Sequence, residues 1–138
     1  MLTITANQRR QIFTFAREAA PNECCGLIGG TIEGVARSIH PLTNVARNPH
    51  TAYEAAPEDL FASQRQMREQ GEQLLAIYHS HPRAIEPEPS QTDRRLAYYP
   101  QAVYLIIGLG GATPVMRGFK IIESEGRWEA VEYAIADE

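Results

Sequence analysis

Two histidines two residues apart, with a serine and an aspartate close behind them, are the side chains of this sequence best placed to do chemistry together. They lie in YHSHPRAIEPEPSQTD, residues 78–93. The preceding LLAIY is a continuous apolar run, as in a buried central strand. Alternate side chains of a strand face the same way, so we expect one face to end in two imidazoles. The residues of that face are Leu75, Ile77, His79 and His81.

The residues after this strand can bring a carboxylate back toward the two imidazoles. Three prolines stop the strand and stiffen the return, Ser90 stands at a helix N-cap position, and Asp93 falls in the first turn. Neutral imidazole and carboxylate are both zinc ligands. Two histidines and one aspartate leave the fourth position of a tetrahedral zinc open, which is typical of a catalytic site and not of a closed structural one.

Each half of this pattern also has an ordinary explanation. A single His-x-His at the end of a strand is most often incidental, and Ser-x-x-Asp is a common helix start. The combination favours a metal site, because both histidines leave a buried strand on one face and a stiff loop returns a carboxylate to them.

Hydrolysis at such a metal also needs a base that takes a proton from water and passes it to the leaving amine. Glu23, in PNECCGLIGG, follows a proline that stops a helix and precedes a buried strand. Taken alone, Glu23 is better explained as a solvated loop carboxylate. It becomes a candidate base only if the metal site lies next to it.

The elements that must position these residues follow from hydrophobic periodicity and turn residues. We expect a mixed α/β domain, with a largely antiparallel sheet of six or seven strands, two main helices and a shorter third. Its strands are predicted near 2–4, at 25–31 and 35–40 (a hairpin turned at Glu33-Gly34), near 53, and at 74–78, 102–109, 115–122 and 128–135. Its helices are predicted from Thr5, which forms a capping box with Gln8, to about 20, over 57–70 with Gly71 just past the end, and within 90–99.

Length, composition and charge narrow the possible classes of protein. The 138 residues, 43% of them hydrophobic, fit one globular domain, residues 1–138. The net charge of −4 argues against a nucleic acid or an anionic membrane as partner. No apolar run approaches the roughly 20 residues that span a bilayer, and the first residues do not resemble a secretory signal. Cys24 and Cys25 are adjacent, and adjacent cysteines rarely form a disulfide bond with each other. We therefore expect a cytoplasmic protein with reduced thiols.

Three motifs taken in order resemble the signature of the JAMM (MPN-plus) metalloprotease family. NECCGLIGG, YHSHP and PSQTD match a Glu before an apolar, glycine-containing strand, then His-Ser/Thr-His-Pro, then a proline-rich loop and Ser-x-x-Asp. One departure is that eight residues, PRAIEPEP, replace the usual seven between the second His and the Ser. The usual register would place Pro89 and Thr92 at the functional positions, so we expect a loop enlarged by one residue.

The resemblance implies the fold and the role of each residue. The fold would be the MPN/JAMM, cytidine-deaminase-like architecture. His79, His81 and Asp93 would hold one Zn2+ per chain, Glu23 would be the general acid and base, and Ser90 would donate a hydrogen bond to the oxyanion. Ser80, on the opposite strand face, would be structural.

The resemblance also implies a substrate. Members of this family hydrolyse the bond after the C-terminal Gly-Gly of ubiquitin or a ubiquitin-like protein, and compact single-domain members are associated with sulfur-carrier proteins. The expected partner is therefore the C-terminal tail of a sulfur carrier. Three alternatives remain at this point: an isopeptidase for lysine-linked conjugates, a non-catalytic scaffold of the same fold, and the DNA-repair-associated branch, whose His-Asn-His motif is absent.

Overall fold

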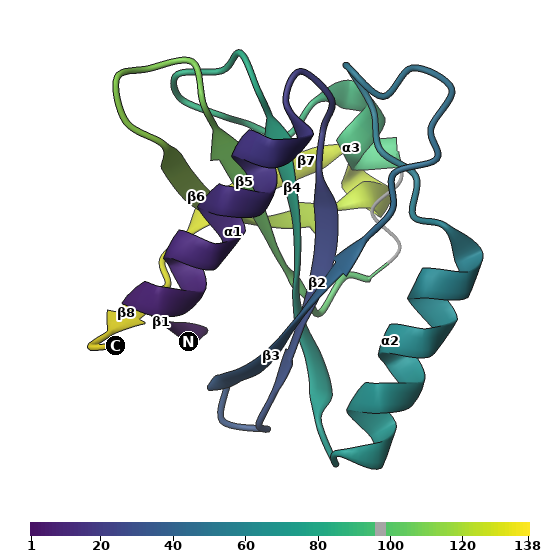
Figure 1. The fold of residues 1–138 in the computed structure, drawn as a ribbon, viewed down its shortest axis with the longest axis vertical. Coiled ribbons are helices and arrows are strands. Elements are labelled where there is room, and N and C mark those ends of the chain that lie inside the picture. The colour runs from purple at the N-terminus through teal and green to yellow at the C-terminus, as the bar shows by residue number, and fades with distance from the viewer. Residues whose placement is uncertain (96–98) are drawn as a thin grey trace.

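The computed structural model describes residues 1–95 and 99–138 and shows a sheet packed between helices (Figure 1). The predicted mixed α/β class is confirmed. In chain order the elements are β1 (Thr3–Thr5), α1 (Ala6–Ala19), β2 (Cys25–Gly30), β3 (Ala36–Leu42), α2 (Pro57–Glu69), β4 (Gln73–His81), α3 (Gln91–Arg95), β5 (Val103–Gly108), β6 (Val115–Ile122), the 3-10 turn Glu123–Glu125, β7 (Arg127–Val131) and β8 (Ala134–Ala136).

The main sheet has six strands in the order β3-β2-β4-β5-β6-β7. Only β4 and β5 are parallel, and every other pair in this sheet is antiparallel. The predicted hairpin is confirmed, and its turn contains Gly34 with φ +96°. Since β4 lies inside the sheet, the two histidines at its end are carried by a strand supported on both sides.

Side chains on the two faces of the sheet form two separate cores. On one face Ile28, Tyr78 and Leu105 pack against α1. On the other, Leu27, Ile77 and Tyr104 pack with Met67 of α2. These residues alternate along β2, β4 and β5, as a pleated sheet with both faces covered requires. α1 and α2 therefore cover opposite faces, which leaves the ends of the strands free for a site.

Both long helices begin and end where the sequence predicts. The Thr5 hydroxyl accepts from the Gln8 amide while the Gln8 side chain accepts from the Thr5 amide, so the capping box is formed. α2 starts at Pro57 and is followed by Gly71 with φ +70°. Within the described residues no helix is long and apolar enough to cross a membrane.

Two strand predictions need correction, and one helix prediction is described only in part. The strand predicted near Tyr53 is only an isolated bridge between Asn44 and Ala55. The strand predicted over 128–135 divides into β7 and β8, because the chain leaves β6 and pairs in parallel with β1, next to both termini in Figure 1. The helix predicted within 90–99 is described over Gln91–Arg95, and its remainder, 96–98, lies outside the described residues.

The predicted face of β4 is wrong at one residue. A bulge shifts the register with β2 between Ile28 and Gly29, which pair with Ala76 and Leu74. Leu75 is the extra residue, so it packs on the α1 side, and Leu74 takes the face shared with Ile77. The bulge precedes the site, so the histidines keep the predicted alternation.

Candidate metal centre and catalytic cleft

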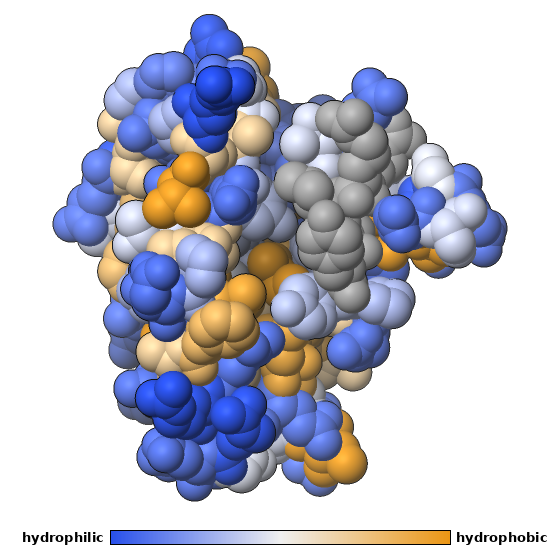
Figure 2. Space-filling view, turned by 90° about the vertical axis from the view of Figure 1, so that its right-hand side faces the viewer, coloured by the Kyte–Doolittle hydropathy of each residue, from blue (hydrophilic) through white to orange (hydrophobic). Residues whose placement is uncertain are grey.

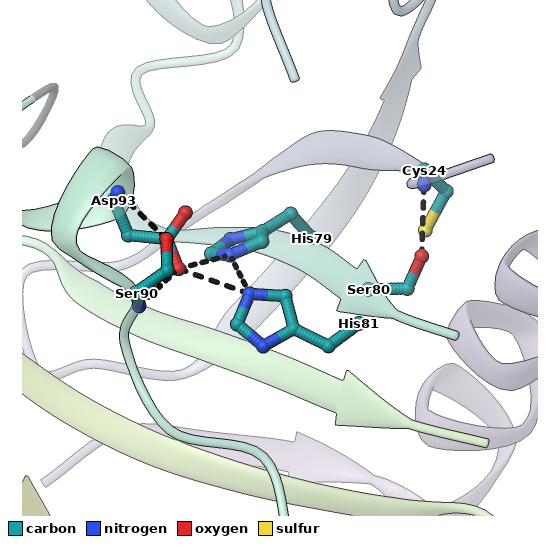
Figure 3. Close-up of polar contacts among 6 residues, drawn as sticks. All are labelled: Cys24, His79, Ser80, His81, Ser90 and Asp93. Atoms are coloured by element: carbon teal, nitrogen blue, oxygen red, sulfur yellow. Dashed lines mark hydrogen bonds and ion pairs between the residues drawn. The ribbon is translucent and has the colours of Figure 1, made fainter. Parts of the chain in front are cut away.

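His79 and His81 stand at the carboxyl end of β4, as the alternation predicts. His79 is completely buried, and the side chain of His81 is 16% exposed. Their Nε2 atoms lie 3.2 Å apart (Figure 3). Ser80 points to the opposite face, where its hydroxyl accepts from the Cys24 amide at 2.8 Å. Ser80 thereby ties β4 to the segment before β2, in agreement with the structural place predicted for it.

The loop after β4 returns Ser90 and Asp93 to the histidines despite its extra residue. The Asp93 amide donates to Ser90 Oγ at 3.0 Å, and the Ser90 amide donates to Asp93 Oδ2 at 2.9 Å. The expected N-cap is therefore formed. The loop rests on Gly108, where a Cβ would lie 2.5 Å from the Ala84 carbonyl oxygen. This close approach of two backbones fixes the loop from the side of β5.

Three candidate ligand atoms form a nearly equilateral triangle. Asp93 Oδ2 lies 3.0 Å from Nε2 of both His79 and His81, which are themselves 3.2 Å apart. Tetrahedral ligands about 2.0–2.1 Å from a zinc ion are separated by about 3.3 Å. One ligand atom of Glu23 also falls within 4.8 Å of all of these atoms. Both the donor types and their separations fit a zinc ion.

Charge at the site favours a bound cation. Burial disfavours the ionised form of Asp93, but the two imidazoles and the Ser90 amide outweigh it and hold the pKa of Asp93 well below its usual range. Burial also opposes a charge on His81, whereas the hydrogen bond and charge of Asp93 and the charge of Glu23 raise the pKa of His81. The site thus holds a carboxylate that stays ionised beside two imidazoles, a set of donors that attracts a metal ion.

Glu23 is held beside this triangle of atoms by hydrogen bonds of its backbone. Its amide donates to the Pro49 carbonyl oxygen at 2.7 Å, and its own carbonyl oxygen accepts from Asn44 Nδ2 at 2.9 Å. The side chain is 4% exposed, and its Oε1 has no hydrogen-bond partner among the described residues. Burial raises the pKa of Glu23 to about 8, with a smaller opposing effect from His81. The carboxyl group is thus buried beside the triangle and free to exchange a proton.

Sequence reasoning missed the residue that holds Glu23 in place. Asn44 Nδ2 also donates to the Ala52 carbonyl oxygen, while its Oδ1 accepts from the amides of Ala46 and Glu54. Asn44 therefore organises the loop between β3 and α2. An asparagine in a long segment without periodicity was the available signal, because such side chains often bond the backbone of a functional loop.

A second missed residue is Tyr53, in the same loop. Its ring stacks on His79, with centroids 4.5 Å apart and planes at 28°. Tyr53 also forms part of the wall of an apolar cavity of about 380 Å³. Figure 2 looks at the α2 side of the molecule and shows hydrophobic residues at the bottom of a hollow. Tyr53 therefore helps to keep water from the buried His79 imidazole.

The two cysteines and the two other histidines lie in different surroundings. Cys24 and Cys25 are buried free thiols. His40 lies on β3 and bonds Ser38. His50, in contrast, lines a cleft of about 570 Å³ together with Glu23, His81 and Ser90. Glu23, His81 and Ser90 therefore border one common space.

Comparisons with known proteins agree with this arrangement. Residues 5–122 match the family described as prokaryotic homologs of the JAB domain. A desampylase from Haloferax volcanii is 37% identical over 115 residues, which cover 80% of this chain and 82% of that protein. A CysO-cysteine peptidase from Mycobacterium tuberculosis is 36% identical over 109 residues, covering 78% of this chain and 73% of that protein.

Solved structures show the same fold. A solution structure of a protein from Desulfitobacterium hafniense has a TM-score of 0.87 and 33% identity, and the match covers 100% of this chain and 94% of that one. A JAB1/MPN domain protein from Archaeoglobus fulgidus has a TM-score of 0.63 at 18% identity, covering 98% and 99% of the two chains. The second likeness supports the fold alone.

Proposed function

This chain belongs to the prokaryotic homologs of the JAB domain, and from that premise we propose that it is a zinc-dependent peptidase for the C-terminal tail of a ubiquitin-like protein. The bond cleaved would be the one after the terminal Gly-Gly, and the ubiquitin-like protein a sulfur carrier. The observation that carries the proposal is the triangle of His79, His81 and Asp93 donor atoms beside the buried, partnerless Glu23.

His79, His81 and Asp93 are the proposed ligands of one zinc ion per chain. When bound, zinc supplies Lewis-acid chemistry: it lowers the pKa of a coordinated water toward about 7 and polarises a carbonyl group. The ligands are held for this task before any ion arrives, because β4 fixes both imidazoles and the α3 N-cap fixes the carboxylate.

Glu23 and Ser90 carry out the proton transfer and charge stabilisation of the proposed hydrolysis. Glu23 takes one proton from the attacking water, whose oxygen forms a bond to the carbonyl carbon, and delivers it to the nitrogen as the C–N bond breaks. The Ser90 hydroxyl accepts from the Asp93 amide, so its own O–H proton is left to donate to the oxyanion. The products are the Gly-Gly carboxylate and a free amine, so water is consumed and no other reactant is needed.

The relatives support the substrate class. One is named a desampylase, another a CysO-cysteine peptidase, and a protein from Thermus thermophilus, 40% identical over 106 residues, a probable TtuB-protein conjugate cleaving protease. A tail ending in Gly-Gly suits a site in which the backbone must come close to the ligands, because glycine has no side chain to obstruct it. We propose that residues 1–138 act as one domain, in the cytoplasm, where the two thiols stay reduced.

The test is a cleavage assay with purified protein and zinc analysis of the same sample. We expect about one zinc per chain and release of the residue attached beyond Gly-Gly of a sulfur carrier from the same organism. Chelation should abolish cleavage and added zinc should restore it. A zinc-free protein without activity would favour the non-catalytic scaffold, and preferential cleavage of lysine-linked diubiquitin would favour the isopeptidase alternative.

A further inference from the structure

The wall of the catalytic cleft carries one cation that the proposed reaction does not use. The cleft of about 570 Å³ is lined by Glu23, His81 and Ser90 on the catalytic side, and by His50, Thr51 and Arg83 among the remaining residues. Arg83 follows the ligand His81 by two residues, so their Cα atoms are at most about 7 Å apart. Its side chain is therefore attached next to the reacting centre.

The backbone of Arg83 is fixed. A turn after β4 is closed by the Ala84 amide, which donates to the His81 carbonyl oxygen at 3.0 Å. The Gly110 amide then donates to the Ala84 carbonyl oxygen at 2.8 Å. Gly110 lies so close that a Cβ on it would be 2.3 Å from the Arg83 carbonyl oxygen. The start of the side chain is thus held against the β5–β6 connection.

The guanidinium of Arg83, by contrast, has no protein partner among the described residues. It is exposed and makes no ion pair or hydrogen bond there. Arg117 and Arg127 are each within 4 Å of a glutamate carboxylate. In a chain with 17 acidic and 13 basic residues, an arginine left without a carboxylate beside an active site is free to bind one from a substrate.

We propose that Arg83 binds the α-carboxylate of the residue that is released, so that the enzyme prefers a single amino acid attached beyond Gly-Gly. This inference rests on the proposed function and specifies its substrate. The carboxylate of such a residue is one carbon away from the scissile nitrogen, and a guanidinium pairs with a carboxylate through two parallel hydrogen bonds. A lysine side chain joined through its ε-nitrogen offers no carboxylate at that position.

The composition of the cleft wall makes Arg83 the group that attracts a substrate carboxylate. Glu23 lines this cleft, and one of its oxygens lies within 4.8 Å of the ligand atoms of His79, His81 and Asp93. A guanidinium on the same wall attracts a carboxylate that the substrate brings into this space. Arg83 is the only arginine or lysine among the residues that line the cleft in the described part of the chain.

Two substrates that differ only in their last group test this inference. Both are the sulfur carrier of the same organism with one alanine after Gly-Gly; one ends in a free carboxylate and the other in a carboxamide. We expect zinc-loaded wild-type protein to cleave the free acid with a kcat/KM about tenfold higher, a modest factor because the arginine is exposed to solvent. Arg83→Ala should remove this preference, mainly through KM, and leave cleavage of the carboxamide unchanged.

Two further variants make the test specific. Arg83→Lys keeps the charge without the planar fork and should retain part of the preference. Arg65→Ala removes the same charge from an exposed position on α2 and should behave as wild type. Equal cleavage of both substrates by the wild type, or an equal loss on both in Arg83→Ala, contradicts the role of Arg83 and leaves the proposed function intact. Failure of the zinc-loaded wild type to cleave either substrate contradicts both.

Discussion

Replacing Glu23 by glutamine separates the proposed acid and base from the proposed ligands. The change keeps the size of the side chain and removes only its ability to carry a proton. Glu23 is 4% exposed and its Oε1 has no partner among the described residues, so no hydrogen-bond network is broken. The three proposed ligand atoms come from other residues, so Glu23→Gln should keep its zinc and its stability while it loses hydrolysis.

The expected loss of activity follows from the surroundings of Glu23. A positioned general acid or base contributes about 10²- to 10⁴-fold, or roughly 3–5 kcal/mol of barrier. The other carboxylate beside it, Asp93, already contacts both imidazoles through Oδ2 and cannot take its place. We therefore expect kcat to fall by about 10³-fold or more, in the upper half of this range.

The assay measures zinc content, thermal unfolding and kcat on the same preparations. His81→Ala and Asp93→Ala are the matched variants, because each removes a proposed ligand and should lose the metal together with activity. Cleavage by Glu23→Gln within tenfold of wild type would refute the role of base. Stoichiometric zinc in both ligand variants would refute the ligand set.

Two other variants test the elements that position the site. Asn44→Ala removes the hydrogen bonds that hold the Glu23 carbonyl oxygen and the loop between β3 and α2. We expect kcat to fall about tenfold and the free energy of unfolding to fall by about 1–3 kcal/mol, with zinc content unchanged. A kcat equal to that of the wild type would contradict this prediction. Gly26→Ala would place a Cβ 2.1 Å from the buried Tyr78 ring, so the free energy of unfolding, measured with denaturant, should fall by about 1–3 kcal/mol. Gly111→Ala is the control, because the nearest atom to its Cβ is 3.7 Å away and the free energy of unfolding should change by less than about 0.5 kcal/mol.

The main elements and the positions of the candidate site residues could be predicted because local rules dictate them. Strand alternation placed both histidines on one face, and the Ser-x-x-Asp helix start placed the Asp93 carboxylate next to Ser90. Local rules do not determine whether a loop with one extra residue still brings Ser90 and Asp93 to the histidines. The structure answers this question through long-range contacts, since the loop packs against Gly108 and Gly110 of a later strand and turn.

What could not be predicted depends on pairing between distant segments. The bulge at Leu75 arises where β4 pairs with β2, and no residue pattern in LLAIY predicts it. The division of 128–135 depends on β1, which offers β8 an edge more than a hundred residues away in sequence. Asn44 and Tyr53 act through contacts with Glu23 and His79, so their importance is visible only once the loop is folded.

The register between β2 and β4 explains how a glutamate more than fifty residues away reaches the proposed metal site. Cys25 pairs with His79, and the contacts between Cys24 and Ser80 continue the ladder by one residue. Continuing once more places Glu23 opposite His81, on the same face as both histidines, because side chains two apart on a strand face the same way. A shift of one residue would bring the Cys24 thiol to this position and turn the carboxylate to the α1 side. The spacing between Glu23 and Cys25, the first residue of regular pairing, is therefore fixed, because inserting or deleting one residue there would turn the carboxylate to the other face.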